Sequence, residues 1–139
     1  MSAIKLEKNY PVFKEAVWVH LINDELLSSW CMPCNNFLLE RGQEFEFKIP
    51  PNIFFDGTFY NKVMDYSENV FLSYRCIAKK PKIDTVVSWT LSESRGKTNL
   101  TLEHSGFKGS QWLTKIMLAA GWKKMMNSHL HEKLVQFES

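Results

Sequence analysis

Two cysteines stand three residues apart in the segment Trp30-Cys31-Met32-Pro33-Cys34. Thiols at this spacing can close a small disulfide and exchange it with other disulfides. The exchange needs a thiolate, and a thiol ionises more readily when it lies at the N-terminus of a helix. A redox role for the pair therefore depends on which element begins or ends at Cys31.

The residues around the pair predict an unsuitable context. Thioredoxin-type sites share the Trp-Cys-x-Pro-Cys pattern but follow a buried parallel strand, whereas Leu26 and Trp30 have helical spacing before Cys31. After Cys34 the chain soon reaches Gly42, so no long helix follows. We expect no redox role, although the two thiols can still form a small disulfide.

Histidines offer the other candidate chemistry. His129 and His131 lie beside Glu132, but helix positions i and i+2 do not share a face, so we expect surface histidines and no metal. His104 shares a strand face with Leu102, which favours a hydrogen-bonded core histidine over one that contacts a ligand. With no phosphate loop, nucleophile elbow or catalytic triad, we expect no enzyme and no cofactor.

Composition limits the partners and the location. The net charge of +2 gives no basic field for nucleic acid, and Lys79-Lys80-Pro81-Lys82 is typical of a solvated turn. No apolar run reaches the ~20 residues of a membrane span, so we expect no membrane partner. The first residues lack the apolar core of a signal peptide, and three sparse cysteines suit a reducing cytoplasm. The 139 residues predict one domain, 1–139.

The elements that must position these side chains follow from periodicity. Residues 4–10 alternate as a strand, and Pro11 and Asn23 then begin two short helices. Further alternating runs predict strands at 44–49, 55–63, 70–76, 87–91 and 98–104, with turns at 65–69, 79–84 and 93–97. Connections this short allow only antiparallel neighbours. We predict an α+β fold, a curved seven-stranded antiparallel sheet that grips a long C-terminal helix.

That helix spans about 110–137. Its predicted buried stripe consists of apolar residues at helical spacing, and Gly121 in mid-helix indicates a bend or a close contact. The stripe comprises Trp112, Leu113, Ile116, Ala120, Leu130, Leu134 and Phe137.

A series of short motifs resembles the START-like (helix-grip, SRPBCC) superfamily, and within it the relatives of the activator of the heat-shock-protein-90 ATPase. The resemblance covers nearly the whole chain, and it rests on the order and spacing of the motifs. Cys31 departs from the pattern, because it replaces a second aromatic residue. The matching residues are Pro11, Val17-Trp18, Leu21, Glu25-Leu26-Leu27, Trp30, Pro33, 42–47, 57–59, 87–91, 98–107 and Gly121-Trp122.

The resemblance implies a curved antiparallel sheet, two small helices, and a C-terminal helix across the concave face with a cavity between them. Family members bind apolar molecules, act as co-chaperones, or have no assigned activity. The eukaryotic co-chaperones carry an additional N-terminal domain, for which this chain has no room, and no family catalytic motif is present. Trp30 and Pro33 match the family pattern, so the resemblance implies that the spacing of Cys31 and Cys34 is a coincidence and not a redox motif.

Aromatic residues on alternating strand positions predict the cavity itself. An empty cavity of ~300 Å³ costs about 7 kcal/mol, so the space is either filled by its own side chains or occupied by a ligand. We expect a non-enzymatic domain that binds a small hydrophobic or aromatic molecule, with Tyr74 and His104 as polar contacts. The predicted cavity residues are Trp30, Phe45, Phe47, Phe59, Tyr74, Trp89, Leu102, His104, Trp112 and Ile116.

Two alternatives remain open. The first is a chaperone-associated, stress-related interaction module, which predicts an exposed apolar patch around Met117, Trp122, Met125 and Met126. The second is an enzyme that acts on a hydrophobic substrate in the cavity, but no pair of titratable groups in the sequence indicates shared proton transfer.

Overall fold

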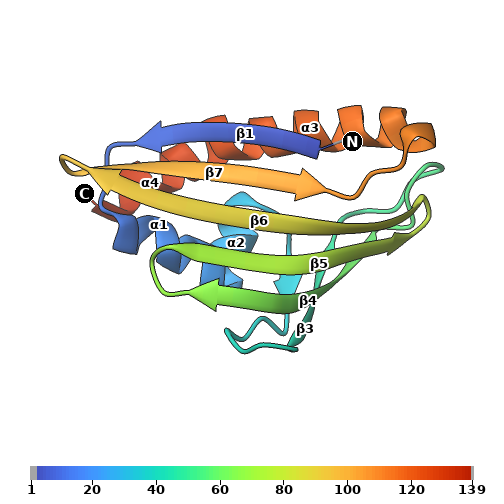
Figure 1. The fold of residues 1–139 in the computed structure, drawn as a ribbon, viewed down its shortest axis with the longest axis horizontal. Helices are drawn as coiled ribbons and strands as arrows, with labels where there is room; N and C mark the ends of the chain where they lie inside the picture. Colours follow the sequence, from blue (N-terminus) through green and yellow to red (C-terminus); the bar gives the residue numbers. More distant parts are fainter. Residues whose placement is uncertain (1–2, 139) are drawn as a thin grey trace.

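The computed structural model describes residues 3–138, so Met1, Ser2 and Ser139 of the predicted domain lie outside it. Within these residues the chain forms a sheet with its helices on one face (Figure 1). The strands are β1 (Ala3–Tyr10), β2 (Cys34–Asn35), β3 (Glu44–Lys48), β4 (Thr58–Ser67), β5 (Phe71–Lys79), β6 (Lys82–Ser94) and β7 (Lys97–Ser105). The helices are α1 (Lys14–Ile22), α2 (Asp24–Trp30), the 3-10 turn η1 (Gly109–Gln111), α3 (Trp112–Lys124), the π-helical η2 (Met125–Leu130) and α4 (His131–Glu138).

The sheet confirms the predicted fold class. Its strand order is β1-β7-β6-β5-β4-β3-β2, and each neighbouring pair is antiparallel. The alternating runs of the sequence account for six of the seven strands in residues 3–138. The seventh, β2, pairs Cys34 with Phe47 and Asn35 with Glu46, and two residues are too few to show an alternation.

The bounds of β4 differ from the prediction at both ends. The strand begins at Thr58 and continues to Ser67, so the turn expected at 65–69 begins three residues later, at Glu68. A bulge between Val63 and Asp65 shifts the register with β5, and the pairing then continues as far as Ser67 and Phe71. A bulge inserts an extra residue into the strand, so the side chains on its two sides do not follow one period of two, and the alternation in the sequence does not reveal the second part.

Aromatic rings fill much of the concave face. Trp89 lies between two other tryptophans, with ring centroids 6.0 Å from Trp30 and 5.4 Å from Trp122. Phe45 contacts the Tyr74 ring at 5.1 Å. These contacts are edge-to-face, the arrangement in which ring quadrupoles attract. They join α2, α3 and the sheet in one core.

The buried stripe of the C-terminal helix differs from the predicted one. Leu130 and Leu134 are fully buried as expected, but they share the stripe with Trp122 and Met126. The stripe predicted for the first half of the helix is wrong, because Trp112, Leu113, Ile116 and Ala120 are exposed. Phe137, at the other end, is also about half exposed.

A π-helical segment explains the four-residue spacing of the buried stripe. An α-helix has about 3.6 residues per turn, so residues spaced by four drift around its axis. The wider π turn at Met125–Leu130 holds more residues per turn and reduces that drift. The Tyr10 hydroxyl of β1 donates a 2.7 Å hydrogen bond to the Met126 carbonyl within this segment. Among the helices of the described residues, none combines the length and apolar character of a transmembrane segment.

Candidate ligand-binding site

A cavity of about 530 Å³ lies between α3, the concave face of the sheet and the loop 49–57. Its volume is within the usual range for small-molecule sites. The lining is mostly apolar and aromatic. It comprises Cys31, Met32, Phe47, Ile49, Asn52, Phe54, Phe55, Phe59, Tyr74, Cys76, Pro81, Val87, His104, Leu113, Thr114, Met117, Leu118, Gly121, Trp122, Lys124, Met125 and His129.

The helix wall of the cavity is open at one end. Leu113, Met117 and Gly121 lie on one face of α3 because they are spaced by four residues. Leu113 and Met117 line the cavity and are still 56% and 55% exposed. A side chain placed on Gly121 would meet nothing within 4 Å, so the predicted close contact at this glycine is absent. The first half of α3 therefore borders unfilled space.

The loop 49–57 forms a second wall and has a defined conformation. The Asn52 side chain accepts hydrogen bonds from the backbone of Phe54 at 2.8 Å and Phe55 at 3.0 Å. At the base of the loop, Ile49 N–H donates to the Gly57 carbonyl at 2.9 Å. Gly57 has a φ of +94°, and a Cβ there would lie 2.6 Å from the Ile49 carbonyl oxygen, so only glycine fits.

His104 connects the sheet to α3 through a chain of hydrogen bonds. Trp122 Nε1–H donates to His104 Nδ1 at 3.1 Å, so the imidazole proton lies on Nε2, which is 2.8 Å from the Thr85 hydroxyl. Thr85 in turn donates to the Cys76 carbonyl at 2.8 Å. Burial lowers the pKa of His104 to about 4. The prediction of a hydrogen-bonded core histidine is confirmed, and the ring also borders the cavity.

Tyr74 provides a polar group inside the apolar cavity. Its hydroxyl accepts a 3.1 Å hydrogen bond from Trp89 Nε1–H, and burial raises the pKa of the hydroxyl well above its usual value. Within residues 3–138 no acceptor for its proton is present. The hydroxyl is thus a neutral donor without an acceptor, on a residue that lines the cavity.

The three cysteines are free thiols in protected surroundings. Cys31 follows the C-terminus of α2, the negative end of the helix, where the dipole does not favour a thiolate. Burial raises the pKa of the Cys31 and Cys34 thiols and raises that of Cys76 to about 12. This geometry is the opposite of the one that activates a thiol.

The two neighbouring histidines diverge as predicted. His129 lines the cavity, whereas the ring centroid of His131 lies 6.2 Å from that of Tyr10. Among the described residues, no three His, Cys, Asp or Glu side chains are grouped closely enough to hold a metal ion.

The structure brings together four of the ten predicted cavity residues. Phe47, Phe59, Tyr74 and His104 line the cavity. Four others, Trp30, Phe45, Trp89 and Leu102, are buried in the core and do not line it. Trp112 and Ile116 were expected to face the sheet but are 62% and 57% exposed and lie outside the cavity, because the helix is rotated relative to the predicted stripe.

Sequence reasoning missed the loop and part of the helix wall. Phe55 is predicted to begin the strand 55–63, but it lies with Phe54 in an irregular segment before β4, where alternation does not determine which way a side chain points. Gly121 and Lys124 were outside the predicted stripe. The glycine was the one available signal, because a residue without a side chain leaves space beside a helix.

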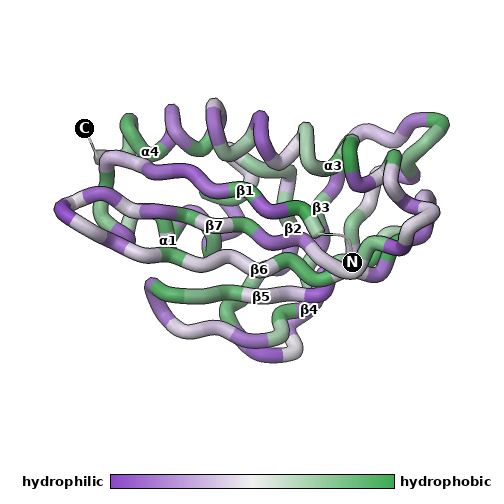
Figure 2. Tube along the Cα trace, turned by 45° about the horizontal axis from the view of Figure 1, so that its top comes forward, coloured by the Kyte–Doolittle hydropathy of each residue, from purple (hydrophilic) through white to green (hydrophobic). Residues whose placement is uncertain are grey.

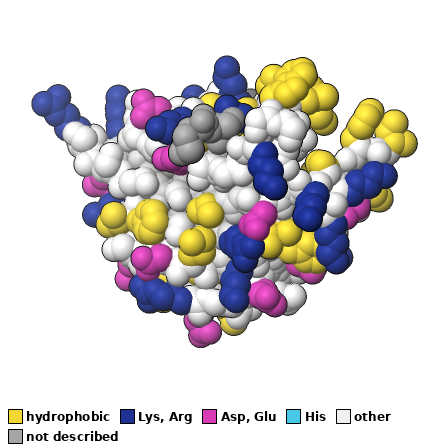
Figure 3. All heavy atoms as spheres, turned by 45° about the vertical axis from the view of Figure 1, so that its right-hand side comes forward, with side chains coloured by type: hydrophobic (Ala, Val, Ile, Leu, Met, Phe, Trp, Pro, Cys, Tyr) yellow, Lys and Arg dark blue, Asp and Glu magenta, His cyan; other side chains and the backbone are white. Residues whose placement is uncertain are grey.

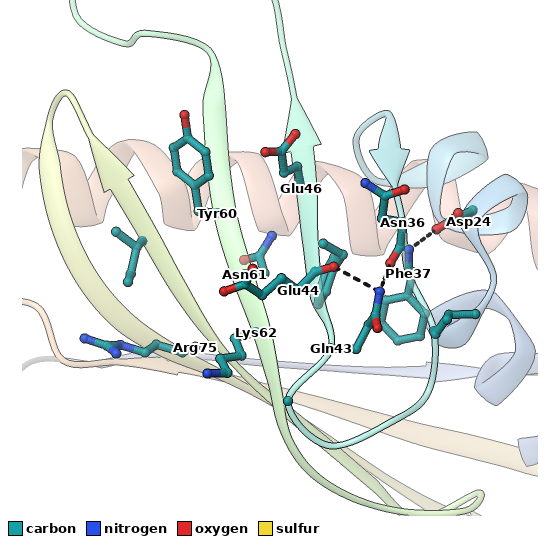
Figure 4. A pocket seen from close by; sticks show the side chains of 14 residues that line it. Asp24, Asn36, Phe37, Gln43, Glu44, Glu46, Tyr60, Asn61, Lys62 and Arg75 are labelled. Carbon is teal, nitrogen blue, oxygen red and sulfur yellow. Dashed lines mark hydrogen bonds between the residues drawn. The ribbon is translucent and has the colours of Figure 1, made fainter.

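A second, larger hollow of about 920 Å³ lies around β3, β4 and β5. Figure 4 shows charged side chains of both signs there, among them Glu44, Lys62 and Arg75. Arg75 is already paired with Asp84, and Gln43 donates to the Asn36 and Glu44 carbonyls. The buried Asn61 Oδ1, which also lines this hollow, has no hydrogen-bond partner among the described residues. Because charges of both signs line the hollow, it is a weaker candidate for an apolar ligand than the cavity under α3.

Comparison with known proteins identifies the fold and the family. Protein MLL2253 from Mesorhizobium loti matches with a TM-score of 0.85 at 22% identity, covering 99% of both chains. Protein BH1534 from Bacillus halodurans matches with a TM-score of 0.78 at 23% identity, covering 95% of this chain and 96% of its own. DynU16, from the dynemicin biosynthetic locus, matches with a TM-score of 0.76 at 20% identity, covering 96% of this chain and 47% of its own. No curated protein sequence matches the chain.

At these identities the solved structures show a shared fold and nothing more specific. The family model described as Activator of Hsp90 ATPase homolog 1-like protein matches residues 11–134, which is most of the chain. The resemblance that the sequence motifs indicated is thus confirmed, and the chain belongs to the family of Activator of Hsp90 ATPase homolog 1-like proteins.

Proposed function

We propose that this protein is a non-enzymatic START-like domain that binds a small hydrophobic or aromatic molecule in the cavity under α3. The observation that carries the proposal is an apolar, ring-lined space of about 530 Å³ beside the face of α3 that carries Leu113, Met117 and Gly121. Leu113 and Met117 keep more than half of their surface exposed there. Fully burying such a side chain contributes about 1.5–3 kcal/mol, so a ligand that covers them gains part of that free energy.

The cost of leaving the space empty supports the same conclusion. At ~24 cal/mol per Å³, a sealed and dry apolar cavity of this size would cost about 13 kcal/mol, so water or a ligand fills the space. The open end admits water, and water against apolar walls is readily displaced by an apolar ligand.

The titratable groups in the cavity favour binding over catalysis. Both ring nitrogens of His104 have hydrogen-bond partners, and in the part of the chain that the structure describes no carboxylate lines the cavity. The Cys31 and Cys76 thiols are held neutral by burial. Lys124 and His129 also line the cavity and are exposed, but no carboxylate of the described residues lines it with them to orient a general base or share a proton.

A titration followed by amide chemical shifts tests the proposal. Candidate lipids, flavonoids and polyketides are added to nitrogen-labelled protein, and we expect shifts at cavity residues such as Phe59, Tyr74 and Met117. Gly121→Leu places a side chain in the cavity and should abolish the shifts. Gly109→Leu is the matched control, because Gly109 also has open space around it but does not line the cavity. Shifts that persist in Gly121→Leu, or none with any class, would contradict the proposal.

One observation favours a second function, an interaction module for a chaperone of the heat-shock-protein-90 type. Trp112 and Ile116 are exposed and lie one helical turn apart, outside the cavity. On the end of the molecule where α3 begins, Figure 3 shows hydrophobic side chains that project among Lys and Arg side chains. The patch expected from the sequence is wrong in part, because Trp122 and Met126 are buried.

A pull-down with the chaperone separates the two functions. If Trp112 and Ile116 form the contact, Trp112→Ala should weaken capture while Gly121→Leu leaves it unchanged. Equal capture of both variants and the unchanged protein would argue against this patch.

A further inference from the structure

The charge around the cavity is one-sided. Among the described residues, Lys124 is the single Lys, Arg, Asp or Glu that lines it, and His129 also lines it. Both side chains are exposed, so they mark an opening of the cavity to solvent at the C-terminal end of α3. No Asp or Glu of residues 3–138 lines the cavity. The ion pairs within residues 3–138 are Arg41–Asp65, Lys48–Glu46 and Arg75–Asp84, so the Lys124 ammonium group has no carboxylate partner there.

The π-helical segment places these two polar residues together. Lys124 is the last residue of α3, and His129 lies five residues later within η2. In an α-helix, residues five apart point in well-separated directions, whereas a π turn closes over five residues and brings i and i+5 nearly into line. Both side chains therefore border the cavity, although a regular helix would direct them to different sides.

The rest of the cavity is complementary to the uncharged, apolar part of a ligand. Its walls carry the rings of Phe47, Phe55 and Phe59, together with Leu118 and Val87. The Tyr74 hydroxyl, with its free proton, suits a carbonyl or ether oxygen. Lys124 and His129 are both exposed, so a charged group bound between them stays in contact with water. A charge at such a place has a small desolvation cost, unlike a charge carried into the interior.

We infer that the ligand is an amphipathic anion: an apolar, ring-compatible body bound under α3, with one carboxylate or sulfonate at the opening between Lys124 and His129. This inference rests on the proposed function and adds the chemical class of the ligand. The apolar walls provide most of the affinity. The basic opening distinguishes an acid from its neutral analogue, and no acidic side chain in the lining opposes the anion.

Two fluorescent probes that share one apolar body test the inference. Phenylnaphthylamine is neutral, and anilinonaphthalene sulfonate carries the same rings with one sulfonate. The fluorescence of both rises in apolar surroundings, so a titration gives each dissociation constant. Lys124→Gln should weaken sulfonate binding about threefold, the size of an exposed ion pair, and leave the neutral probe unchanged. Added salt should likewise weaken binding of the sulfonate probe and leave binding of the neutral probe unchanged.

The adjacent lysine supplies the matched control. Lys123 lies on the same helix and is also exposed, but it does not line the cavity, so Lys123→Gln should change neither constant. Circular dichroism of both variants should match that of the unchanged protein.

The possible failures are distinguishable. The inference of an anionic ligand is wrong if Lys124→Gln leaves sulfonate binding unchanged, or if Lys123→Gln weakens it equally. The proposed function still stands in that case, provided that Gly121→Leu abolishes binding of the neutral probe. If Gly121→Leu affects neither probe, the cavity is not the binding site and both proposals are overturned.

Discussion

The two halves of the C-terminal helix differ in what they pack against. The first half is α3, and the second half comprises η2 and α4. In the second half, Met126, Leu130 and Leu134 are almost fully buried, and the Met126 carbonyl is hydrogen-bonded to Tyr10. In the first half, Trp122 alone is buried, and the cavity separates Leu113 and Met117 from the sheet. Figure 2 shows this helix as a continuous run from α3 to α4, so the difference comes from side-chain packing and not from a break in the chain.

This contrast assigns different roles to the two halves. Packed apolar side chains contribute directly to the free energy of unfolding. An apolar helix face that borders open space contributes little to it and is available to a ligand. We conclude that the second half anchors the helix to the sheet, and the first half covers the cavity.

The largest expected effect comes from truncating a leucine in each half. Leu130→Ala should lower the free energy of unfolding by about 3 kcal/mol, because it leaves a cavity at a fully buried site. Leu113→Ala removes an exposed side chain and should lower it by less than about 1 kcal/mol, while weakening ligand binding. Urea denaturation of both variants measures the difference. Similar losses in both would remove the contrast.

Acid should weaken the hydrogen bond between Trp122 of α3 and His104 of the sheet. His104 has a folded-state pKa of about 4, below the usual unfolded value near 6.5, so the unfolded chain takes up a proton first as the pH falls. The stabilising effect is complete above pH ~6.5 and should fall by about 1.4 kcal/mol per pH unit down to pH ~4, roughly 3 kcal/mol in total.

Urea denaturation over this pH range, compared with the same series for His104→Gln, isolates the contribution of His104. Burial also lowers the pKa of His20, which acts in the same direction but is present in both proteins. A difference between the two series that does not vary with pH would contradict the predicted linkage.

Loss of the Tyr10 hydroxyl tests the packed half alone. Tyr10→Phe leaves the Met126 carbonyl of the π-helical segment without that donor and should cost about 1–2 kcal/mol of unfolding free energy. The ligand affinity should not change, since neither residue lines the cavity. Chemical denaturation and a binding titration check the two expectations, and a large loss of affinity would show that the two halves are coupled.

The smallest effect has the opposite sign. Gly121→Ala should raise the free energy of unfolding by about 1 kcal/mol, because alanine favours the helix and the added Cβ meets no atom within 4 Å. Thermal unfolding provides the measurement. A destabilised variant would mean that the space beside Gly121 is occupied.

The contrast also explains what the sequence could and could not predict. Strict alternation predicted the sheet, because a strand with one buried face repeats every two residues. The helix phase was mispredicted because Trp112 and Trp122 are equally apolar, and a π turn changes which of them a regular stripe would bury. Tyr74 and His104 were identified because strand alternation fixes which way they point. Lys124 and the ring of Phe54 depend on a helix irregularity and an aperiodic loop, which no period indicates.

Hydrogen exchange of the backbone amides, with and without phenylnaphthylamine, tests the central claim most directly. In the free protein we expect amides between Leu113 and Gly121 to exchange faster than those of η2 and α4, because fewer buried contacts hold that half closed. The probe should slow exchange between Leu113 and Gly121 and leave η2 and α4 unchanged. Equal protection of both halves in the free protein, or no slowing of the first half by the probe, would contradict the account.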